Sequence, residues 1–282
     1  MSLLVFGQTG QVAQELKRLR PTAHFIGRDE ADLSDPKSCT NAIHKAHPTA
    51  VINAAAYTVV DKAEDDESLA AVVNGAAPGA MAEACAKLDI PFIHISTDYV
   101  FDGAGLQAFA PDHPTKPLSA YGRTKLLGEE AVRSAKGRYG ILRTSWVFSA
   151  HGANFVKTML RLGVERDRLT IVADQIGGPT PASGIAQTCL TMAVALANDA
   201  GAAGIYHYAG APDVSWADFA RAIFDEANLD VEVEDIPTTA YPTPAQRPLN
   251  SRLDCASLTA QFGIIRPDWR AHVSDVIKEL SL

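Results

Sequence analysis

Thr97, Tyr121 and Lys125 are of the types that an enzyme reducing a carbonyl group needs for proton transfer. Tyr121 begins a predicted helix and Lys125 follows four residues later, so both side chains share one helix face. A free phenol has a pKa of about 10, and we expect a neighbouring ammonium to lower it. Tyr121 can then give a proton to a carbonyl oxygen while a nicotinamide supplies hydride.

The position of these residues gives the pattern its weight, because a tyrosine four residues before a lysine is common by chance. Ser96, Thr97 and Asp98 follow the apolar run from residue 92 to 95 at the end of a predicted parallel strand. Open α/β sheets bind ligands at that edge. Strand register is ambiguous by one residue, so the pattern leaves open whether Ser96 or Thr97 faces the cleft.

A glycine-rich turn near the N-terminus predicts a dinucleotide site. The apolar run Leu3–Phe6 leads into the spacing Gly-x-x-Gly-x-x-Ala at residues 7–13, followed by a helical pattern. The glycines permit a tight turn and a close backbone approach, and the helix N-terminus favours a pyrophosphate. This spacing is typical of short-chain dehydrogenases/reductases. The predicted cofactor-binding residues here are Gly7, Thr9, Gly10, Gln11 and Val12.

The next strand end bears on the choice of cofactor. Arg28 follows the strand His24–Ile26 and suits the 2′-phosphate of NADPH, whereas Asp29 leaves NADH open as an alternative. Asp32 and Leu33 are placed to meet the adenine, although Asp32 can equally cap a helix. The predicted set of cofactor-binding residues is completed by the segment after the third strand and by the two active-site residues on the helix: Ala55, Ala56, Tyr57, Tyr121 and Lys125.

Composition and charge exclude several classes of protein. The chain has 282 residues, 47% hydrophobic and 21% charged, with a formal net charge of −8. These values predict a globular protein and argue against a nucleic-acid partner. We find no apolar run near the roughly 18 residues of a membrane span and no leader or lipidation signal. A cytoplasmic protein without a membrane partner is therefore expected.

Metal and disulfide sites are not predicted. The four cysteines are widely scattered, which indicates buried free thiols. His44 and His47 are the one histidine pair with close spacing, and we interpret it as accidental on a surface helix.

Alternating patterns predict an α/β fold, a Rossmann-type doubly wound parallel sheet with a smaller C-terminal substrate-binding region. Residues 1–150 form the expected NAD(P)-binding domain, and residues 151–282 the substrate-binding region, partly interwoven with it. The expected strands are Leu3–Phe6, His24–Ile26, Ala50–Asn53, Pro91–Ser96 and Tyr139–Arg143; helices are expected over Asp66–Leu88, Ser119–Lys136 and Asn154–Arg161.

Motifs spread over most of the chain carry a resemblance to a known family. They include the turn at 7–12, the segments 53–58, 60–64, 96–101, 121–125 and 143–148, and the run 247–251. Together they resemble the dTDP-4-dehydrorhamnose reductases, a family of extended short-chain dehydrogenases/reductases. The resemblance implies that Thr97 and Tyr121 hold the keto oxygen, while Lys125 binds the nicotinamide ribose and tunes the tyrosine.

The same resemblance implies a substrate site. It places Asp98, Tyr99 and Trp146 around a sugar, and Asn154 and Arg247 near a nucleotide diphosphate. Trp146 can instead be core packing, Asn154 a helix cap, and Arg247 part of a surface salt bridge. The implied activity is NADPH-dependent reduction of the C4 keto group of dTDP-4-dehydro-6-deoxy-L-mannose to dTDP-L-rhamnose, the last step of dTDP-rhamnose biosynthesis.

Two alternatives remain. One is a reductase of another nucleotide-linked 4-ketosugar. The other is a non-catalytic nucleotide-binding regulatory subunit of the same fold, similar to the beta subunit of methionine adenosyltransferase; the complete set Thr97, Tyr121 and Lys125 argues against it.

Assembly is the point at which the chain departs from the family pattern. Some members dimerise through Mg²⁺ held by glutamates, and Glu15 fits one such position. The segment 181–184 lacks the expected acidic residue, so a Mg²⁺-bridged dimer is doubtful and a monomer or weak homodimer is expected. We interpret Glu15 as a solvated carboxylate.

Overall fold

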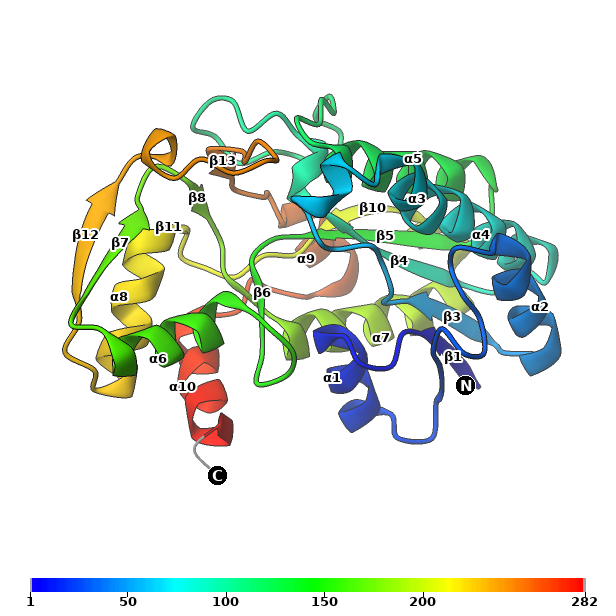
Figure 1. Cartoon of the computed structure of the whole chain (residues 1–282). Helices are drawn as coiled ribbons and strands as arrows, with labels where there is room; N and C mark the ends of the chain where they lie inside the picture. Colours follow the sequence, from blue (N-terminus) through cyan, green and yellow to red (C-terminus); the bar gives the residue numbers. More distant parts are fainter. Residues whose placement is uncertain (1, 281–282) are drawn as a thin grey trace.

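A six-stranded parallel sheet forms the centre of the computed structural model, which describes residues 2–280 (Figure 1). The strand order is β10-β5-β4-β3-β1-β2, so the chain reverses direction across the sheet between β1 and β3. These strands are β1 (Leu3–Phe6), β2 (His24–Ile26), β3 (Ala50–Asn53), β4 (Phe92–Thr97), β5 (Tyr139–Thr144) and β10 (Gly204–His207). The predicted doubly wound sheet is confirmed.

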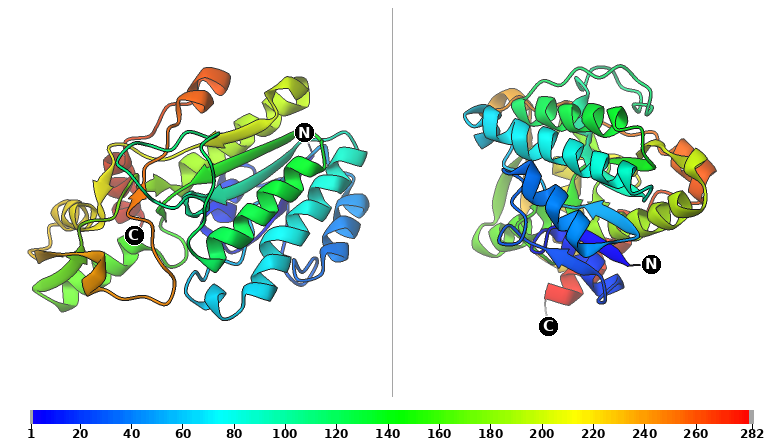
Figure 2. Two further views of the ribbon diagram at one scale, coloured as in Figure 1. Left: turned by 90° about the horizontal axis from the view of Figure 1, so that it is seen from above. Right: turned by 90° about the vertical axis from the view of Figure 1, so that its right-hand side faces the viewer.

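Helices cover both faces of this sheet, as Figures 1 and 2 show. One core lies between the sheet and the helices α1 (Gln11–Leu19), α7 (Ala182–Asn198) and α9 (Ala256–Phe262). The other core lies between the opposite face and the helices α2 (Pro36–Ala46), α4 (Ala77–Lys87) and α5 (Ala120–Ser134). Because both faces are buried, the strands are apolar almost throughout.

A smaller layer follows at the C-terminal edge of the sheet. Its core is built from aromatic and aliphatic side chains of α6 (Phe155–Glu165), α8 (Trp216–Ala227) and α10 (Trp269–Leu280), together with the parallel pair β7 (Arg168–Val172) and β12 (Glu232–Ile236). Short strands join it to the main sheet: β6 (Val147–Phe148), β8 (Ile176–Gly177), β9 (Thr180–Pro181), β11 (Val214–Ser215) and β13 (Asn250–Ser251).

Most predicted elements are found within one or two residues of their expected ends, with three exceptions. The strand β10 was not predicted; it pairs with β5 and brings the C-terminal half into the central sheet. The helix α6 runs four residues beyond the predicted end at Arg161. The predicted helix 66–88 is α3 (Glu67–Ala71), a π-helical turn η2 (Val72–Ala76) and α4.

The stretch from α3 to α4 bears on the expectation that the chain has no membrane span. By length and composition, Glu67–Lys87 is apolar enough to cross a membrane, although no such run was predicted, and 56% of its most apolar window is buried inside the molecule. It packs against α2 and α5. Its apolar composition is therefore accounted for by contacts within the protein.

Candidate active site

The first turn of α5 is held against the end of β4, which brings Tyr121 beside Thr97. Ser119 caps the helix by accepting from the Gly122 backbone N–H at 3.2 Å, and Glu64 Oε1 accepts from the Ala120 N–H at 2.9 Å. A Cβ atom at Gly122 would collide with the carbonyl oxygen of Tyr99. The helix can therefore approach the strand end this closely only with glycine at that position.

Four of the predicted site residues meet at this strand end. The Thr97 hydroxyl donates to Asp98 Oδ1 at 3.1 Å and accepts from the Tyr99 backbone N–H at 3.2 Å. The rings of Tyr99 and Tyr121 meet edge to face, with 5.5 Å between centroids. Burial raises the pKa of Asp98 to about 6, because a carboxylate loses its hydration there.

The expected effect of Lys125 on Tyr121 is not found. Burial raises the pKa of Tyr121 to about 12, and hydrogen bonding with Thr97 only partly opposes this. Lys125 Nζ instead donates to the Ile95 carbonyl at 2.7 Å and lies 3.3 Å from His94 Nε2. The prediction was wrong on this point because the loss of hydration dominates the pKa of Tyr121, and the Lys125 amine is bound to the Ile95 carbonyl instead.

A buried ion pair joins β5 to α5 next to the site. Arg143 on β5 holds Glu129 on α5 through two bonds, Nη2 to Oε2 at 2.6 Å and Nε to Oε1 at 2.9 Å. The Ser96 hydroxyl donates to the same carboxylate at 2.5 Å. Ser96 thus points into this network, which resolves the register in favour of Thr97 at the cleft.

Two buried polar atoms at this edge have no hydrogen-bond partner in the described chain, Asp98 Oδ2 and Thr144 Oγ1. The strand register places Thr144 directly beside Thr97. Buried polar groups nearly always have partners. Hydrogen bonding with the Ser251 side chain lowers the pKa of Asp98, so Thr144 Oγ1 is the atom of the two that has room for a polar ligand.

The glycine turn has the geometry that a dinucleotide requires. Gly7 has φ = +114°, which L side chains rarely adopt, and Gly10 begins α1 without a side-chain cap. The first backbone N–H groups of the helix are therefore available to a phosphate. Thr9 is exposed beside them, whereas the Val12 side chain is buried in the core.

The remaining cofactor candidates lie at the ends of β2 and β3. Arg28 is exposed, with its guanidinium 3.9 Å from the Asp32 carboxylate, and Leu33 is half-buried nearby. The Ser34 backbone N–H donates to Asp32 and lowers its pKa. Three half-buried residues follow β3: Ala55, Ala56 and Tyr57. The Tyr57 hydroxyl donates to Asp66 at 3.0 Å.

A cavity of about 780 Å³ opens beside the Tyr99 ring, between the end of β4 and the smaller layer. Arg247 lines it and pairs with Asp61 at 2.8 Å, so the predicted arginine reaches the cavity. Trp216 and Gln175 also line it and are hydrogen-bonded to each other at 3.1 Å. Neither of these two was predicted, because no local motif marks them; the stretch containing Asp61 was noted for its resemblance alone.

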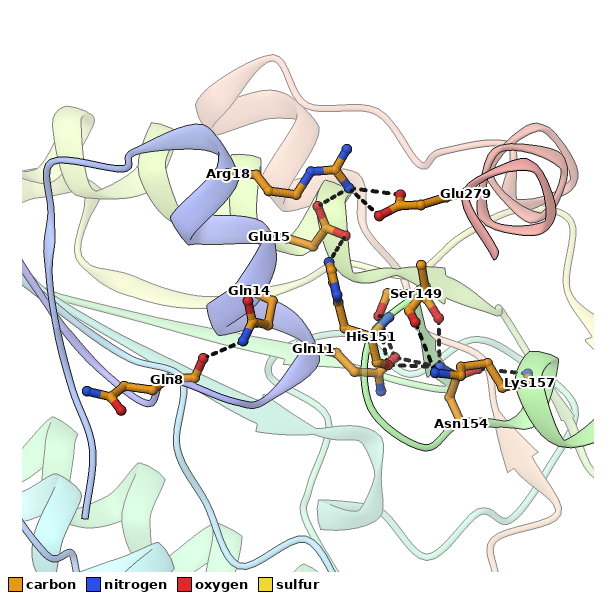
Figure 3. A network of polar contacts seen from close by, with 11 residues as sticks. Gln8, Gln11, Gln14, Glu15, Arg18, Ser149, His151, Asn154, Lys157 and Glu279 are labelled. Carbon is orange, nitrogen blue, oxygen red and sulfur yellow. Dashed lines mark hydrogen bonds and ion pairs between the residues drawn. The ribbon is translucent and has the colours of Figure 1, made fainter. Parts of the chain in front are cut away.

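Two predicted substrate residues have structural roles in this arrangement. Trp146 stacks on Trp216 with ring centroids 3.6 Å apart, so it supports the cavity wall from behind. Asn154 caps α6 by accepting from the Lys157 N–H, and its amide donates to Gln11 Oε1 at 3.0 Å (Figure 3). The side chain of Gln11 is likewise used to join α1 to the segment before α6.

Glu15 corrects the expectation of a solvated carboxylate. It is only 6% exposed, lies 3.6 Å from both Arg18 and His151, and burial raises its pKa (Figure 3). Arg18 in turn pairs with Glu279 of α10. Across residues 2–280, no group of three or more His, Cys, Asp or Glu side chains is arranged to hold a metal.

Comparison with known proteins agrees with this geometry. The model of the RmlD substrate binding domain matches residues 1–282. The chain belongs to this family. It is 44% identical to a dTDP-4-dehydrorhamnose reductase of Sinorhizobium fredii, over 100% of this chain and 98% of that protein. It is 45% identical to one of Burkholderia thailandensis, over 99% of each.

Solved structures of the family extend the comparison. A dTDP-4-dehydrorhamnose reductase from Clostridium acetobutylicum superposes with a TM-score of 0.93 at 33% identity, over 100% of both chains. One from Bacillus anthracis, in complex with NADP, superposes with a TM-score of 0.91 at 31% identity, over 99% of this chain and 100% of that one. The likeness therefore covers the smaller C-terminal layer as well as the sheet.

Proposed function

We propose that this chain is a dTDP-4-dehydrorhamnose reductase, which uses NADPH to reduce the C4 keto group of dTDP-4-dehydro-6-deoxy-L-mannose to dTDP-L-rhamnose. The observation that carries the proposal is the meeting of Thr97 and Tyr121 at the C-terminal end of β4, with Lys125 one turn further along α5. Full-length relatives that are 44% and 45% identical bear the name of this activity.

The protein's own groups supply the proton and the polarisation. Burial raises the pKa of Tyr121 to about 12, so the phenol is protonated at neutral pH but is a weak acid. It can still give its proton to the alkoxide that forms at C4, because an alkoxide is a stronger base than a phenolate. The phenol donates a hydrogen bond to the keto oxygen, and the Thr97 hydroxyl donates a second one when its single hydrogen turns away from Asp98 Oδ1. The phenol proton passes to the keto oxygen as the C4–H bond forms. Bound NADPH supplies the hydride. Tyr121 is left as a phenolate that solvent must reprotonate.

The glycine turn fits the cofactor's pyrophosphate, on the N–H groups at the start of α1 between Gly7 and Val12. Arg28 is placed for the 2′-phosphate, and Asp32 and Leu33 for the adenine. Small residues at the end of β3, Ala55 and Ala56 with Tyr57, leave room for the nicotinamide half, whose ribose Lys125 holds.

The nucleotide sugar occupies the cavity beside this site. Its sugar lies against Thr97, Asp98 and Tyr99, and Arg247 offers positive charge to the diphosphate. The aromatic wall of Trp216, backed by Trp146, suits the base. In this proposal Asn154 acts indirectly: it caps α6, and residues of α6 line the cavity.

This arrangement assigns the cofactor and the reacting sugar to residues 1–150, and the diphosphate and base contacts of Arg247 and Trp216 to residues 151–282. We further propose a cytoplasmic enzyme that acts as a monomer or weak homodimer, independently of nucleic acid and membranes.

Absorbance at about 340 nm, with NADPH and then NADH, tests the proposal on enzymatically prepared dTDP-4-dehydro-6-deoxy-L-mannose. We expect Tyr121→Phe to lower kcat by at least a hundredfold while leaving the Kd of NADPH within about twofold, since the lost group acts in the transition state. Tyr139→Phe, at the opposite end of the sheet, is the matched control. Normal turnover by Tyr121→Phe, or oxidation only with GDP- or UDP-linked ketosugars, would refute it.

A further inference from the structure

Three polar side chains, Asn53, His94 and Lys125, form a buried chain of contacts under α5. His94 on β4 is 0% exposed, and the strand register places it directly beside Asn53 on β3, which is 1% exposed. Lys125 is 2% exposed and enters this space from above. A Cβ atom at Gly128 would collide with the Asn74 carbonyl oxygen. Glycine at this position therefore lets α5 pack closely against the π-helical turn η2.

The direction of the hydrogen bonds in this chain is fixed at one end. The Ala55 backbone N–H donates to Asn53 Oδ1 at 3.2 Å, so the amide oxygen of Asn53 is committed. The Asn53 amide nitrogen must then donate to His94 Nδ1, 3.3 Å away. A neutral ring that accepts at Nδ1 carries its proton on Nε2.

That proton faces Lys125 Nζ across 3.3 Å, and Nζ itself donates to the Ile95 carbonyl at 2.7 Å. Every donor in the chain therefore has an acceptor if Lys125 is a neutral amine, whose lone pair receives the Nε2–H. An ammonium has no lone pair. It would reverse the chain and leave the Asn53 amide nitrogen facing the Ala55 N–H, donor to donor.

The surroundings of Lys125 shift its pKa in opposite directions. Burial lowers the pKa of Lys125 to about 8, and Glu129, one turn along the same helix, raises it. Arg143 from β5 already holds that carboxylate. His94 is the titratable group facing Lys125 from β4, and burial followed by the lysine's charge lowers its pKa, which keeps the ring neutral. The π-helical turn η2 contributes Asn74, which is polar but does not titrate.

We propose that Asn53 and His94 are positioning residues of the reductase: they hold Lys125 beside the Ile95 carbonyl and favour its neutral amine, and the neutral fraction of the lysine takes up a proton when it moves to the nicotinamide ribose. Ribose hydroxyls accept hydrogen bonds, so they can bind the ammonium form of Lys125, which the contact with His94 disfavours. Cofactor binding is thereby coupled to proton uptake at one named atom. The inference rests on the proposed NADPH-dependent function.

The tautomer of His94 is the first test. Long-range ¹⁵N–¹H correlation spectra of the cofactor-free protein at about pH 9, assigned with His94→Gln, report which ring nitrogen carries the proton. We expect a neutral ring protonated on Nε2. A ring protonated on Nδ1, or on both nitrogens, would overturn the proposal.

Proton uptake on binding NADPH is the second test. Titration calorimetry in buffers of different ionisation enthalpy counts the protons taken up. A group with a pKa of about 8 is half-protonated at pH 8, so we expect Lys125 to contribute about half a proton at pH 8 and about 0.1 at pH 7. His94→Gln should take up less than half as much as the native protein at pH 8, because its amide oxygen can accept from an ammonium in the resting place.

His44→Gln makes the same chemical change at an exposed position of α2 and should leave the uptake unchanged. Equal uptake by the native protein and His94→Gln would overturn the proposal. Neither measurement uses the ketosugar, so failure to reduce that sugar, with normal NADPH binding, would count against the proposed substrate and leave this inference standing.

Discussion

Glu129 and Glu67 are each held by an arginine in the same two-bond geometry, yet in opposite surroundings. Arg143 and Glu129 have side chains 2% and 1% exposed. Arg123 holds Glu67 with bonds of 2.8 Å each, and those side chains are 43% and 44% exposed. Replacing either glutamate by glutamine removes one carboxylate with almost no change in shape, so the pair isolates the effect of burial.

We expect Glu129→Gln to destabilise the fold by about 3 to 5 kcal/mol. The substitution leaves Arg143 buried with no opposite charge, and it weakens three charge-assisted hydrogen bonds to the carboxylate, two from Arg143 and one from Ser96. The Pro111 carbonyl at 3.0 Å and the Phe101 ring beneath the guanidinium remain, which keeps the estimate within that range.

The exposed pair should matter much less. Water solvates both partners of Arg123 and Glu67 once they separate, so Glu67→Gln should destabilise the fold by less than about 1 kcal/mol. For a chain of this size, 1 kcal/mol shifts the melting temperature by roughly 2 to 4 °C. The expected shifts are therefore on the order of 10 °C for Glu129→Gln and below about 4 °C for Glu67→Gln.

Thermal unfolding followed by circular dichroism at pH 7.5, in low salt and in 0.5 M NaCl, measures both shifts. Salt should shrink the small effect of Glu67→Gln and leave that of Glu129→Gln, because buried charges are poorly screened. Similar shifts for the two variants, or a shift under about 4 °C for Glu129→Gln, would show that burial does not govern the strength of this pair.

Two further predictions concern the site. The folded protein holds the proton of Asp98 more tightly than the unfolded chain does, because the pKa is raised from 3.8 to about 6. The stability that comes from protonated Asp98 is therefore lost as the pH rises through about 6, and the loss amounts to about 3 kcal/mol. Asp98→Asn carries no charge, so it should raise the melting temperature at pH 8 and lose that advantage towards pH 4. A gain that is equal at both pH values would contradict this cause. Trp216→Ala should raise the KM of the nucleotide sugar about tenfold, from about 1.4 kcal/mol of lost aromatic contact, with the Kd of NADPH unchanged; steady-state assays check this, and an unchanged KM would exclude Trp216 from the site.

The features that the sequence determined by itself are local ones. The strands β1, β2 and β3 have the expected ends, because an apolar run bounded by glycine or polar residues indicates a strand directly. Tyr121 and Lys125 lie on one helix because their spacing of four residues matches the helical period. The Gly7 turn follows from a backbone conformation that glycine adopts readily.

Only the tertiary structure decided which groups are desolvated and what they meet. Glu15 reads as a surface carboxylate until α10 and the segment around His151 close over it. The phenol of Tyr121 has a high pKa, and Lys125 turns to His94, because residues far apart in sequence remove water from both. Trp216 forms the cavity wall through a contact made 70 residues away with Trp146. Burial is a sum over distant parts of the chain, so local patterns place a residue on an element and leave its electrostatic surroundings to the fold.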